Sequence, residues 1–269
     1  MAEIIGWVGS KKNLIKHISH LFPRFEYYCE PFAGSLAIFG ALKPSKAYIS
    51  DLNEDLINMY QVLQNPKDCE KFLKYINVLR DSISERMFYN IRRKFNRGIK
   101  NKCAKAAAFL YLITNAYGNL CRYNKNGEFN APYGKKALAL PTEQRLREFS
   151  EKLESAHIEA CDFEKVLVWA TKPNGFVVMD PPYVPRTLTS NFTSYVKDGF
   201  SWKDQIRLKK VIDTLTKRGV KVMAFNNAVD PIMELYHGYK LHVINIKKPI
   251  SVRKNGRAKK VREVVIMNY

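Results

Sequence analysis

The stretch that most constrains the fold is an apolar run from Gly175 to Met179 that ends abruptly in Asp180-Pro181-Pro182-Tyr183. Four consecutive apolar residues after Gly175 predict a strand that is covered on both faces. Neither proline has an N–H group, so a central sheet ladder cannot continue through them. In open α/β sheets ligands bind beyond the carboxyl ends of the strands, and we expect a chemical site at this point. An ordinary strand followed by a proline turn is the alternative, and the surrounding sequence decides between them.

Strand and helix patterns alternate along most of the chain, which predicts an α/β fold with a mostly parallel sheet. The expected strands are 26–29, 47–51, 157–160, 175–179, 220–225, 240–246 and 261–267. The expected helices are 11–22, 36–42, 53–63, 103–116, 142–153, 166–169, 201–218 and 231–236. Asn53 is expected to be the N-cap of its helix, and the segment 184–200 to be a loop.

Acidic residues follow three of the expected strands, at Asp51, Asp162 and Asp180. Gly34 and its small neighbours follow a fourth, and such a turn lets the backbone approach a ligand closely. Asp51 lies close to the offset of about 20 residues at which nucleotide-binding α/β proteins place a carboxylate for ribose hydroxyls. The chain has neither a P-loop nor a full Gly-x-Gly-x-x-Gly motif. The pattern therefore predicts a nucleoside-sized pocket rather than a triphosphate or pyrophosphate cradle.

The net charge of the chain indicates which class of partner it binds. Lys and Arg number 45 against 25 Asp and Glu, and the resulting net charge of +20 predicts a polyanionic partner. No apolar run reaches the ~18 residues that a membrane helix needs. The five cysteines are widely spaced and form no Cys-x-x-Cys pair. We therefore expect a reduced cytoplasmic protein without a membrane segment, structural zinc or disulfide framework.

Between about Asn65 and Arg147 the pattern changes to helices with dense positive charge and interleaved aromatic residues. The segment 122–130 predicts a β-hairpin that turns at Asn126-Gly127. A basic, aromatic hairpin suits insertion into a nucleic-acid groove, and a solvated surface hairpin is the alternative.

Taken together, the motifs resemble those of DNA adenine-N6 methyltransferases of the Dam and DpnII-methylase type, over nearly the whole chain. The matching motifs are Trp7-Val8-Gly9-Ser10-Lys11, Glu30-Pro31-Phe32-Ala33-Gly34, Asp51-Leu52-Asn53, residues 120–124, 129–134, Asp162-Phe163, Asp180-Pro181-Pro182-Tyr183, residues 191–195 and residues 257–269. The resemblance implies a seven-stranded, Rossmann-like, S-adenosylmethionine-dependent methyltransferase sheet whose last strand is antiparallel. It also implies an inserted, mainly helical DNA-recognition domain that contains the hairpin. The expected division is residues 1–64 and 148–269 for the catalytic domain and 65–147 for target recognition.

The resemblance also implies a role for each matching residue. Asp180 and the Pro181 carbonyl would accept the two hydrogens of the target amine, the proline pair would stiffen the loop, and Tyr183 would stack on the base. Such a mechanism requires the adenine to leave the duplex stack. The residues assigned to S-adenosylmethionine are Trp7, Lys11, Glu30, Phe32, Gly34, Asp51, Asp162, Phe163 and Asp180. For Asp162 a purely N-capping role is the alternative.

For relatives that act on GATC, the resemblance assigns Tyr117 as a wedge in the base stack and Leu120, Arg122 and Pro132 as readers of base edges. The full set of residues assigned to DNA is Arg92, Arg93, Tyr117, Asn119, Leu120, Arg122, Asn124, Pro132, Lys135, Asn191, Arg253 and Arg257. Two positions depart from the family pattern. Gly118-Asn119 stands where relatives usually have Asn-Gly, and Leu36 stands where many have another glycine.

The predicted protein is therefore an enzyme that methylates adenine N6 in double-stranded DNA, with GATC as the expected site and no metal in its chemistry. A cytosine-N4 or RNA-adenine methyltransferase is one alternative, because the same acceptors suit any exocyclic amine. A non-catalytic basic DNA-binding protein on the same fold is another. No membrane or obligate protein partner is indicated. A restriction–modification role, a phage role and a solitary regulatory role all remain open.

Overall fold

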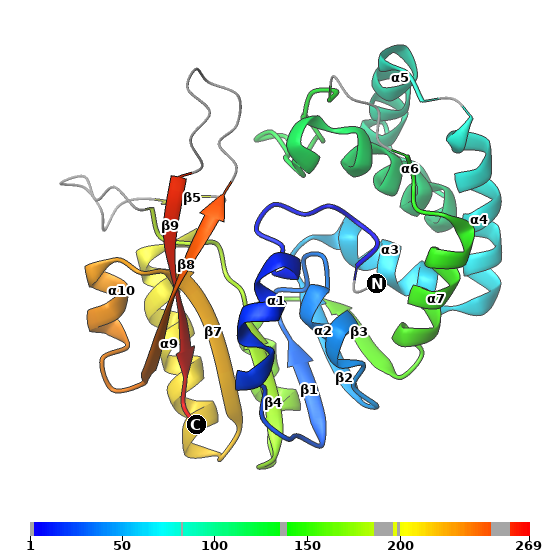
Figure 1. Cartoon of the computed structure of the whole chain (residues 1–269). Coiled ribbons are helices and arrows are strands. Elements are labelled where there is room, and N and C mark those ends of the chain that lie inside the picture. The colour runs from blue at the N-terminus through cyan, green and yellow to red at the C-terminus, as the bar shows by residue number, and fades with distance from the viewer. Residues whose placement is uncertain (1–2, 82, 135–138, 186–195, 198–199, 249–258) are drawn as a thin grey trace. The chain divides into compact units, whose positions relative to one another are not determined.

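The computed structural model describes residues 3–81, 83–134, 139–185, 196–197, 200–248 and 259–269 (Figure 1). Contacts between residues divide the chain into two compact units. Unit 1 comprises Met1–Phe22 and Ala33–Asp162, and unit 2 comprises Pro23–Phe32 and Phe163–Tyr269. The chain passes from one unit to the other at Phe22-Pro23, at Phe32-Ala33 and at Asp162-Phe163.

Among the described residues, seven strands form the main sheet in the order β3-β2-β1-β4-β7-β9-β8. Their bounds are β1 Tyr27–Glu30, β2 Ala47–Asp51, β3 Ala156–Ala160, β4 Gly175–Met179, β7 Lys221–Asn227, β8 Lys240–Lys248 and β9 Lys259–Met267. Strand β4 pairs in parallel with β1 and β7, and β2 with β3. Strand β9, the last in the chain, runs antiparallel to both β7 and β8. The predicted α/β fold with a seven-stranded sheet and an antiparallel last strand is confirmed.

The segment predicted as a loop before the helix at 201–218 contains a short pairing. Strand β5, Val196–Lys197, pairs antiparallel with β6, Phe200–Ser201. Strands of two residues carry too little periodicity to be seen in a sequence, because a period of two needs several repeats to show.

Unit 1 is rich in helices. They are α1 Lys12–Ile18, η1 Ser19–Leu21, α2 Ala37–Leu42, α3 Glu54–Gln64, α4 Pro66–Arg80, α5 Glu85–Asn96, α6 Lys102–Asn115, η2 Tyr117–Asn119 and α7 Glu143–Leu153. Helix α6 is buried along nearly its whole length and packs against α3, α4 and α5. Figure 1 shows these helices, coloured from cyan to green, gathered around α6. The predicted core role of this apolar helix is confirmed.

Caps explain where the central helices of unit 1 begin. The Asn53 side chain accepts a hydrogen bond from the Leu56 amide (3.0 Å) and caps α3, as predicted. Asn65 does the same for α4 by accepting from the Asp68 amide, and Pro66 occupies the first turn, where an N–H group is not needed. The αL backbone of Leu36 (φ 54°) precedes α2. Its positive φ is the conformation that favours glycine, the residue that the resemblance leads one to expect at this position.

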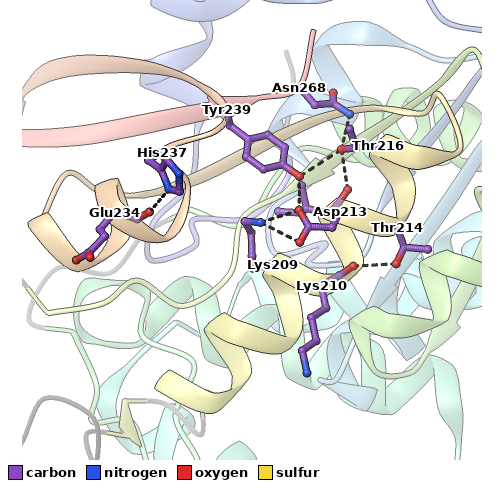
Figure 2. A network of polar contacts seen from close by, with 10 residues as sticks. Lys209, Lys210, Asp213, Thr214, Thr216, Glu234, His237, Tyr239 and Asn268 are labelled. Atoms are coloured by element: carbon purple, nitrogen blue, oxygen red, sulfur yellow. Dashed lines mark hydrogen bonds and ion pairs between the residues drawn. The ribbon is translucent and has the colours of Figure 1, made fainter.

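Unit 2 adds η3 Phe163–Lys165, α8 Val166–Trp169, α9 Trp202–Lys217 and α10 Asp230–Leu235 to its strands. The C-terminal end of α9 is tied down by a polar network (Figure 2). Asp213 accepts from Lys209 and from the Tyr239 hydroxyl. Asn268 donates to Thr216 Oγ1 (2.9 Å) and to the Val220 carbonyl (2.8 Å), and accepts from the Val222 amide (2.8 Å). The network therefore joins the end of this helix to β7 and to the residues that flank β8 and β9.

Candidate active site and DNA-recognition surface

In unit 1, the carboxylate of Asp51 lies against the glycine turn that precedes α2. Asp51 ends β2, and its two oxygens accept from the backbone amides of Gly34 (3.1 Å) and Asn53 (3.0 Å). Burial raises the pKa of Asp51, and the amides of Asn53, Gly34 and Leu52 oppose that rise. The Gly34 carbonyl accepts from the Tyr60 hydroxyl (2.6 Å), which fixes the turn. The structure thus brings together two residues that the sequence assigned to one cofactor.

Trp7 and Lys11 lie on the same unit. A Cβ atom on Gly34 would lie 3.1 Å from Nε1 and Cδ1 of the Trp7 indole, and Gly34 has a positive φ of 44°. Only glycine therefore allows both this turn and this close approach. Lys11 is 6% exposed, and its ammonium donates to the Gly9 carbonyl (2.7 Å). A buried lysine is rare unless paired, so Lys11 differs from the surface cations of the chain.

In unit 2, the Asp180 loop follows the fully buried strand β4, as predicted. The Tyr183 hydroxyl donates to Glu263 Oε2 (3.3 Å) and also interacts with Asp180. Glu263 lies on β9 and is 3% exposed. Burial, and then the negative charges of Asp180 and Glu263, raise the pKa of Tyr183 well above its usual value. Tyr183 therefore remains a protonated hydrogen-bond donor at neutral pH.

Aromatic side chains gather near this loop. The rings of Phe32 and Phe163 stack with centroids 5.4 Å apart, and Phe200 lies 5.9 Å and 5.8 Å from them. Glu30 is 4% exposed and accepts from the Tyr28 hydroxyl (2.7 Å). A pocket adjoins the Asp180 loop, and its lining residues are Tyr183, Val184, Pro185, Phe200, Ser201, Trp202 and Gln205.

Four buried polar residues around the loop escaped the sequence analysis: Gln205, Asn226, Asn227 and Glu263. The sequence contained a signal for Asn226 and Asn227, because they are polar residues at the end of the apolar strand β7, just as Asp51 is at the end of β2. The signal for Gln205 was its spacing from Leu208, Val211 and Leu215, which places a polar residue on the apolar stripe of α9.

The predicted hairpin is present in unit 1, with an antiparallel bridge between Tyr123 and Phe129. Its turn is centred on Lys125-Asn126 rather than on the predicted Asn126-Gly127, and Gly127 follows it with a positive φ of 74°. Its turn is closed by a hydrogen bond from the Gly127 amide to the Asn124 carbonyl (3.0 Å). Arg122 is exposed, and Asn130 across the hairpin accepts from its Nε through the side chain (2.7 Å) and from Nη2 through the carbonyl (3.1 Å).

The hairpin is anchored from two sides. The Tyr123 hydroxyl donates to Asp55 on α3 (2.6 Å), and Lys105 pairs with the same carboxylate (2.6 Å). Asn96 on α5 binds both the amide and the carbonyl of Phe129 (2.9 and 3.1 Å). These anchors hold the inward-facing residues of the hairpin. The exposed Arg122 is consequently presented from a fixed backbone.

The predicted DNA-binding residues between α6 and the hairpin differ in exposure and in contacts. Tyr117 is 56% exposed, and its amide donates to the carbonyl of the exposed Pro132 (2.9 Å), which brings these two predicted DNA residues together. Asn119 has a positive φ of 54°, and its side chain donates to the Ile113 and Thr114 carbonyls at the end of α6. The structure thus gives Asn119 a helix-capping contact. Leu120 is half-buried.

The remaining predicted DNA residues are dispersed. Arg92 donates to the Ala131 carbonyl (3.0 Å) and stacks on Tyr89, whereas Arg93 is exposed and contacts Asn90. Asn124 is engaged within the hairpin turn, where its side chain donates to Glu128 (2.8 Å). The predicted contacts Lys135, Asn191, Arg253 and Arg257 lie outside the described residues.

Two further observations concern the described part of the chain. It contains no cluster of three or more His, Cys, Asp or Glu side chains that could hold a metal ion. Its helices include none that is both long and apolar enough to cross a membrane.

The mostly parallel sheet, with Asp51 at the end of β2 and Asp180 directly after β4, defines an α/β protein of the class whose ligands bind beyond the carboxyl ends of the strands. The family is shown by comparison. A model of the D12 class N6 adenine-specific DNA methyltransferases matches residues 7–250, and the chain belongs to this family. It is therefore an adenine-specific DNA methyltransferase whose substrate is DNA and whose methyl donor is S-adenosylmethionine.

Relatives match along nearly the whole chain. The type II methyltransferase M.MjaIII of Methanocaldococcus jannaschii is 36% identical over 98% of this chain and 97% of its own. M1.LlaDCHI of Lactococcus lactis subsp. cremoris is 34% identical over 98% and 94%. The DNA adenine methylase of Escherichia coli (strain K12) is 30% identical over 97% and 93%. Among solved structures, a putative RNA methyltransferase from Pyrococcus horikoshii aligns with a TM-score of 0.39 and 10% identity, covering 95% of this chain and 80% of that one.

Proposed function

We propose that this enzyme methylates N6 of an adenine in duplex GATC, after the adenine has left the base stack. The observation that carries the proposal is the Asp180-Pro181-Pro182-Tyr183 loop at the buried end of β4, with the aromatic side chain of Phe200 close to Tyr183. A base reaches the acceptors of this loop only when it is extruded from the duplex, as for other enzymes that do chemistry on a base.

The acceptors of this loop are assigned to the target amine. The N6 lone pair of adenine is delocalised into the ring, so the amine must be held in a geometry that frees the lone pair for transfer. The Asp180 carboxylate and the Pro181 carbonyl accept its two hydrogens and favour that geometry. Asp180 also stabilises the positive charge that develops on nitrogen. Tyr183 is assigned to stack on the base while its hydroxyl is held by Glu263 (3.3 Å).

The residues present suit S-adenosylmethionine, which supplies an activated methyl group on sulfur. In unit 1, the Asp51 carboxylate is assigned to the ribose hydroxyls, and the Trp7 indole, which lies against Gly34, is assigned to the wall of the same site. Lys11 is assigned to the same site. The remaining assigned residues stand where the chain passes between the units, namely Glu30, Phe32, Asp162 and Phe163.

Target recognition is assigned to the surface of unit 1 that carries the hairpin. Arg122 offers a guanidinium whose orientation is fixed by Asn130, and such a donor pair suits O6 and N7 of guanine in the major groove. The exposed ring of Tyr117 is assigned as the wedge that fills the stack, next to Pro132. Leu120 is assigned to a base edge. The exposed cation Arg93 suits a phosphate, which gives affinity without sequence information.

The test combines transfer and sequencing. Purified protein is incubated with tritiated S-adenosylmethionine and duplex, single-stranded DNA or RNA, with Asp180→Ala as the matched inactive control. We expect incorporation into duplex DNA alone, and methylated adenine at GATC when DNA from expressing cells is sequenced. Methylation at another sequence contradicts the assigned specificity. Tritium found on cytosine or in RNA indicates that the enzyme methylates a different exocyclic amine. Tight DNA binding without transfer contradicts the catalytic assignment.

We also place the enzyme in the cytoplasm with the cellular or phage DNA, because its substrate lies there. Its relatives carry the names of type II methyltransferases and of DNA adenine methylases, so both a restriction–modification role and a solitary role fit the proposed activity.

A further inference from the structure

Three amide side chains of unit 2 surround the backbone that follows the catalytic aspartate. Gln205 from α9 is 2% exposed, and Asn226 and Asn227 from the end of β7 are 1% and 6% exposed. A buried amide costs free energy unless its donors and acceptor are bonded, so three of them at one place need a structural reason. We refer to Gln205, Asn226 and Asn227 as the amide clamp.

The clamp binds two residues of the loop through their main chain. Asn226 Oδ1 accepts from the Val184 amide (3.1 Å), and Asn226 Nδ2 donates to Gln205 Oε1 (3.1 Å). Gln205 Nε2 in turn donates to the Pro182 carbonyl (3.1 Å). Asn227 Nδ2 donates to the Val184 carbonyl (2.6 Å).

This chain of bonds determines the orientation of each amide. Only an oxygen can accept from the Val184 N–H group, so Asn226 must turn its oxygen toward it and its nitrogen toward Gln205. Gln205 must then turn its oxygen toward Asn226 and its nitrogen toward the Pro182 carbonyl. A rotation of either amide by 180° would place like groups against each other at two points, so the arrangement has one satisfied state.

The loop needs such external support because of its sequence. Pro181 and Pro182 have no N–H groups, so the loop can form few backbone hydrogen bonds of its own. The clamp holds the carbonyls on either side of Tyr183, those of Pro182 and Val184. In the described part of the chain no donor binds the Pro181 carbonyl, which is the group assigned to the target amine.

We propose that the amide clamp sets the position of the Pro181 carbonyl and of Tyr183, and hence the orientation of the target amine during methyl transfer. The three residues are positioning residues, because they act through the loop rather than on the substrate. This inference rests on the proposed role of the Asp180 loop. A reacting group displaced by about 1 Å can lose about 10²-fold in rate, which makes the chemical step the sensitive readout.

The experiment uses two variants that break the same bond by different routes. Gln205→Met keeps the length of the side chain and removes the donor to the Pro182 carbonyl. Asn226→Asp keeps the acceptor for Val184 and removes the donor to Gln205, so Gln205 can satisfy the new carboxylate only by turning its nitrogen away from Pro182. The control is Asn268→Ala, which removes a comparable set of three hydrogen bonds at the other end of α9 and β7. The bond to Thr216 is drawn in Figure 2.

The readouts are the single-turnover rate of methyl transfer to a duplex, the Kd values for S-adenosylmethionine and DNA, and the Tm. We expect both clamp variants to lower the transfer rate at least 30-fold while both Kd values stay within threefold. The control should lower Tm and leave the transfer rate within threefold. If Gln205→Met fails to fold, the same criterion applied to Asn226→Asp decides.

A transfer rate within threefold of wild type in a folded clamp variant overturns the proposal. So does a rate loss that the control reproduces at an equal loss of Tm, because the clamp would then contribute stability alone. Failure of the proposed function gives a different result, since the unmodified enzyme would then show no transfer to duplex adenine.

Discussion

Arg122 gives the sharpest test of the proposal that the hairpin reads DNA. Asn130 holds two of its nitrogens, at 2.7 Å and 3.1 Å, so the guanidinium has a defined plane before DNA binds. A bidentate contact with guanine is worth about 1–3 kcal/mol of discrimination. We therefore expect Arg122→Ala to lower the preference for guanine at one position by about 5- to 150-fold.

The hydrogen bond from Arg122 to the Asn130 side chain has a smaller predicted effect. Asn130→Ala removes the side-chain acceptor and leaves the backbone carbonyl in place. A hydrogen bond contributes about 0.5–1.5 kcal/mol net, and an exposed pair such as this one belongs at the low end. We expect Asn130→Ala to lower the preference about twofold, through the orientation of Arg122. In the Arg122→Ala background, Asn130→Ala should have no further effect on the preference, because the guanidinium that Asn130 orients is then absent.

The assay compares kcat/KM for hemimethylated GATC duplexes in which one guanine at a time is 7-deazaguanine, which lacks the N7 acceptor. In Arg122→Ala, the loss of kcat/KM caused by 7-deazaguanine should disappear at one guanine and remain at the other. The control is Lys125→Ala, an exposed residue in the turn of the same hairpin, which should weaken binding to all duplexes equally. If wild type and Arg122→Ala show the same penalty at both guanines, the assignment of Arg122 to a base is wrong.

Three further predictions concern other sites. Asp180→Ala should abolish transfer while the Kd for DNA, measured by filter binding, stays within a few-fold; substantial turnover in this variant contradicts the amine-binding role. Burial raises the pKa of Asp51 above its usual 3.8, and the ribose hydroxyls proposed as its ligands bind best to an ionised acceptor. Affinity for S-adenosylmethionine should therefore fall with decreasing pH before an ordinary aspartate would protonate, and calorimetry that finds the same pH profile in Asp51→Asn contradicts the assignment. Tyr123→Phe removes the hydrogen bond to Asp55 and should lower the free energy of unfolding by about 1 kcal/mol in urea titration, an unchanged midpoint being the contrary result.

Much of the fold could be predicted because its signals are local. An apolar run that ends in prolines marks a strand and its end, and Asn53 before a periodic segment marks a helix start. Both predictions are confirmed at β4 and α3. The proximity of Gly34 to Asp51 could also be inferred, since both follow strands whose carboxyl ends meet at one edge of a sheet. The β5–β6 pair could not, because two-residue strands show no period.

The residues that the sequence did not reveal share a physical cause. Glu263 is 80 positions away from Tyr183, and no local pattern reports a contact over that separation. Gln205 is different, because it stands on the apolar stripe of α9, where a polar side chain costs free energy unless it finds partners. Its partners turn out to be Asn226 and the Pro182 carbonyl. The polar residue at a core position of the helix after the Asp180 loop was therefore the sequence signal for the main-chain support that this loop receives.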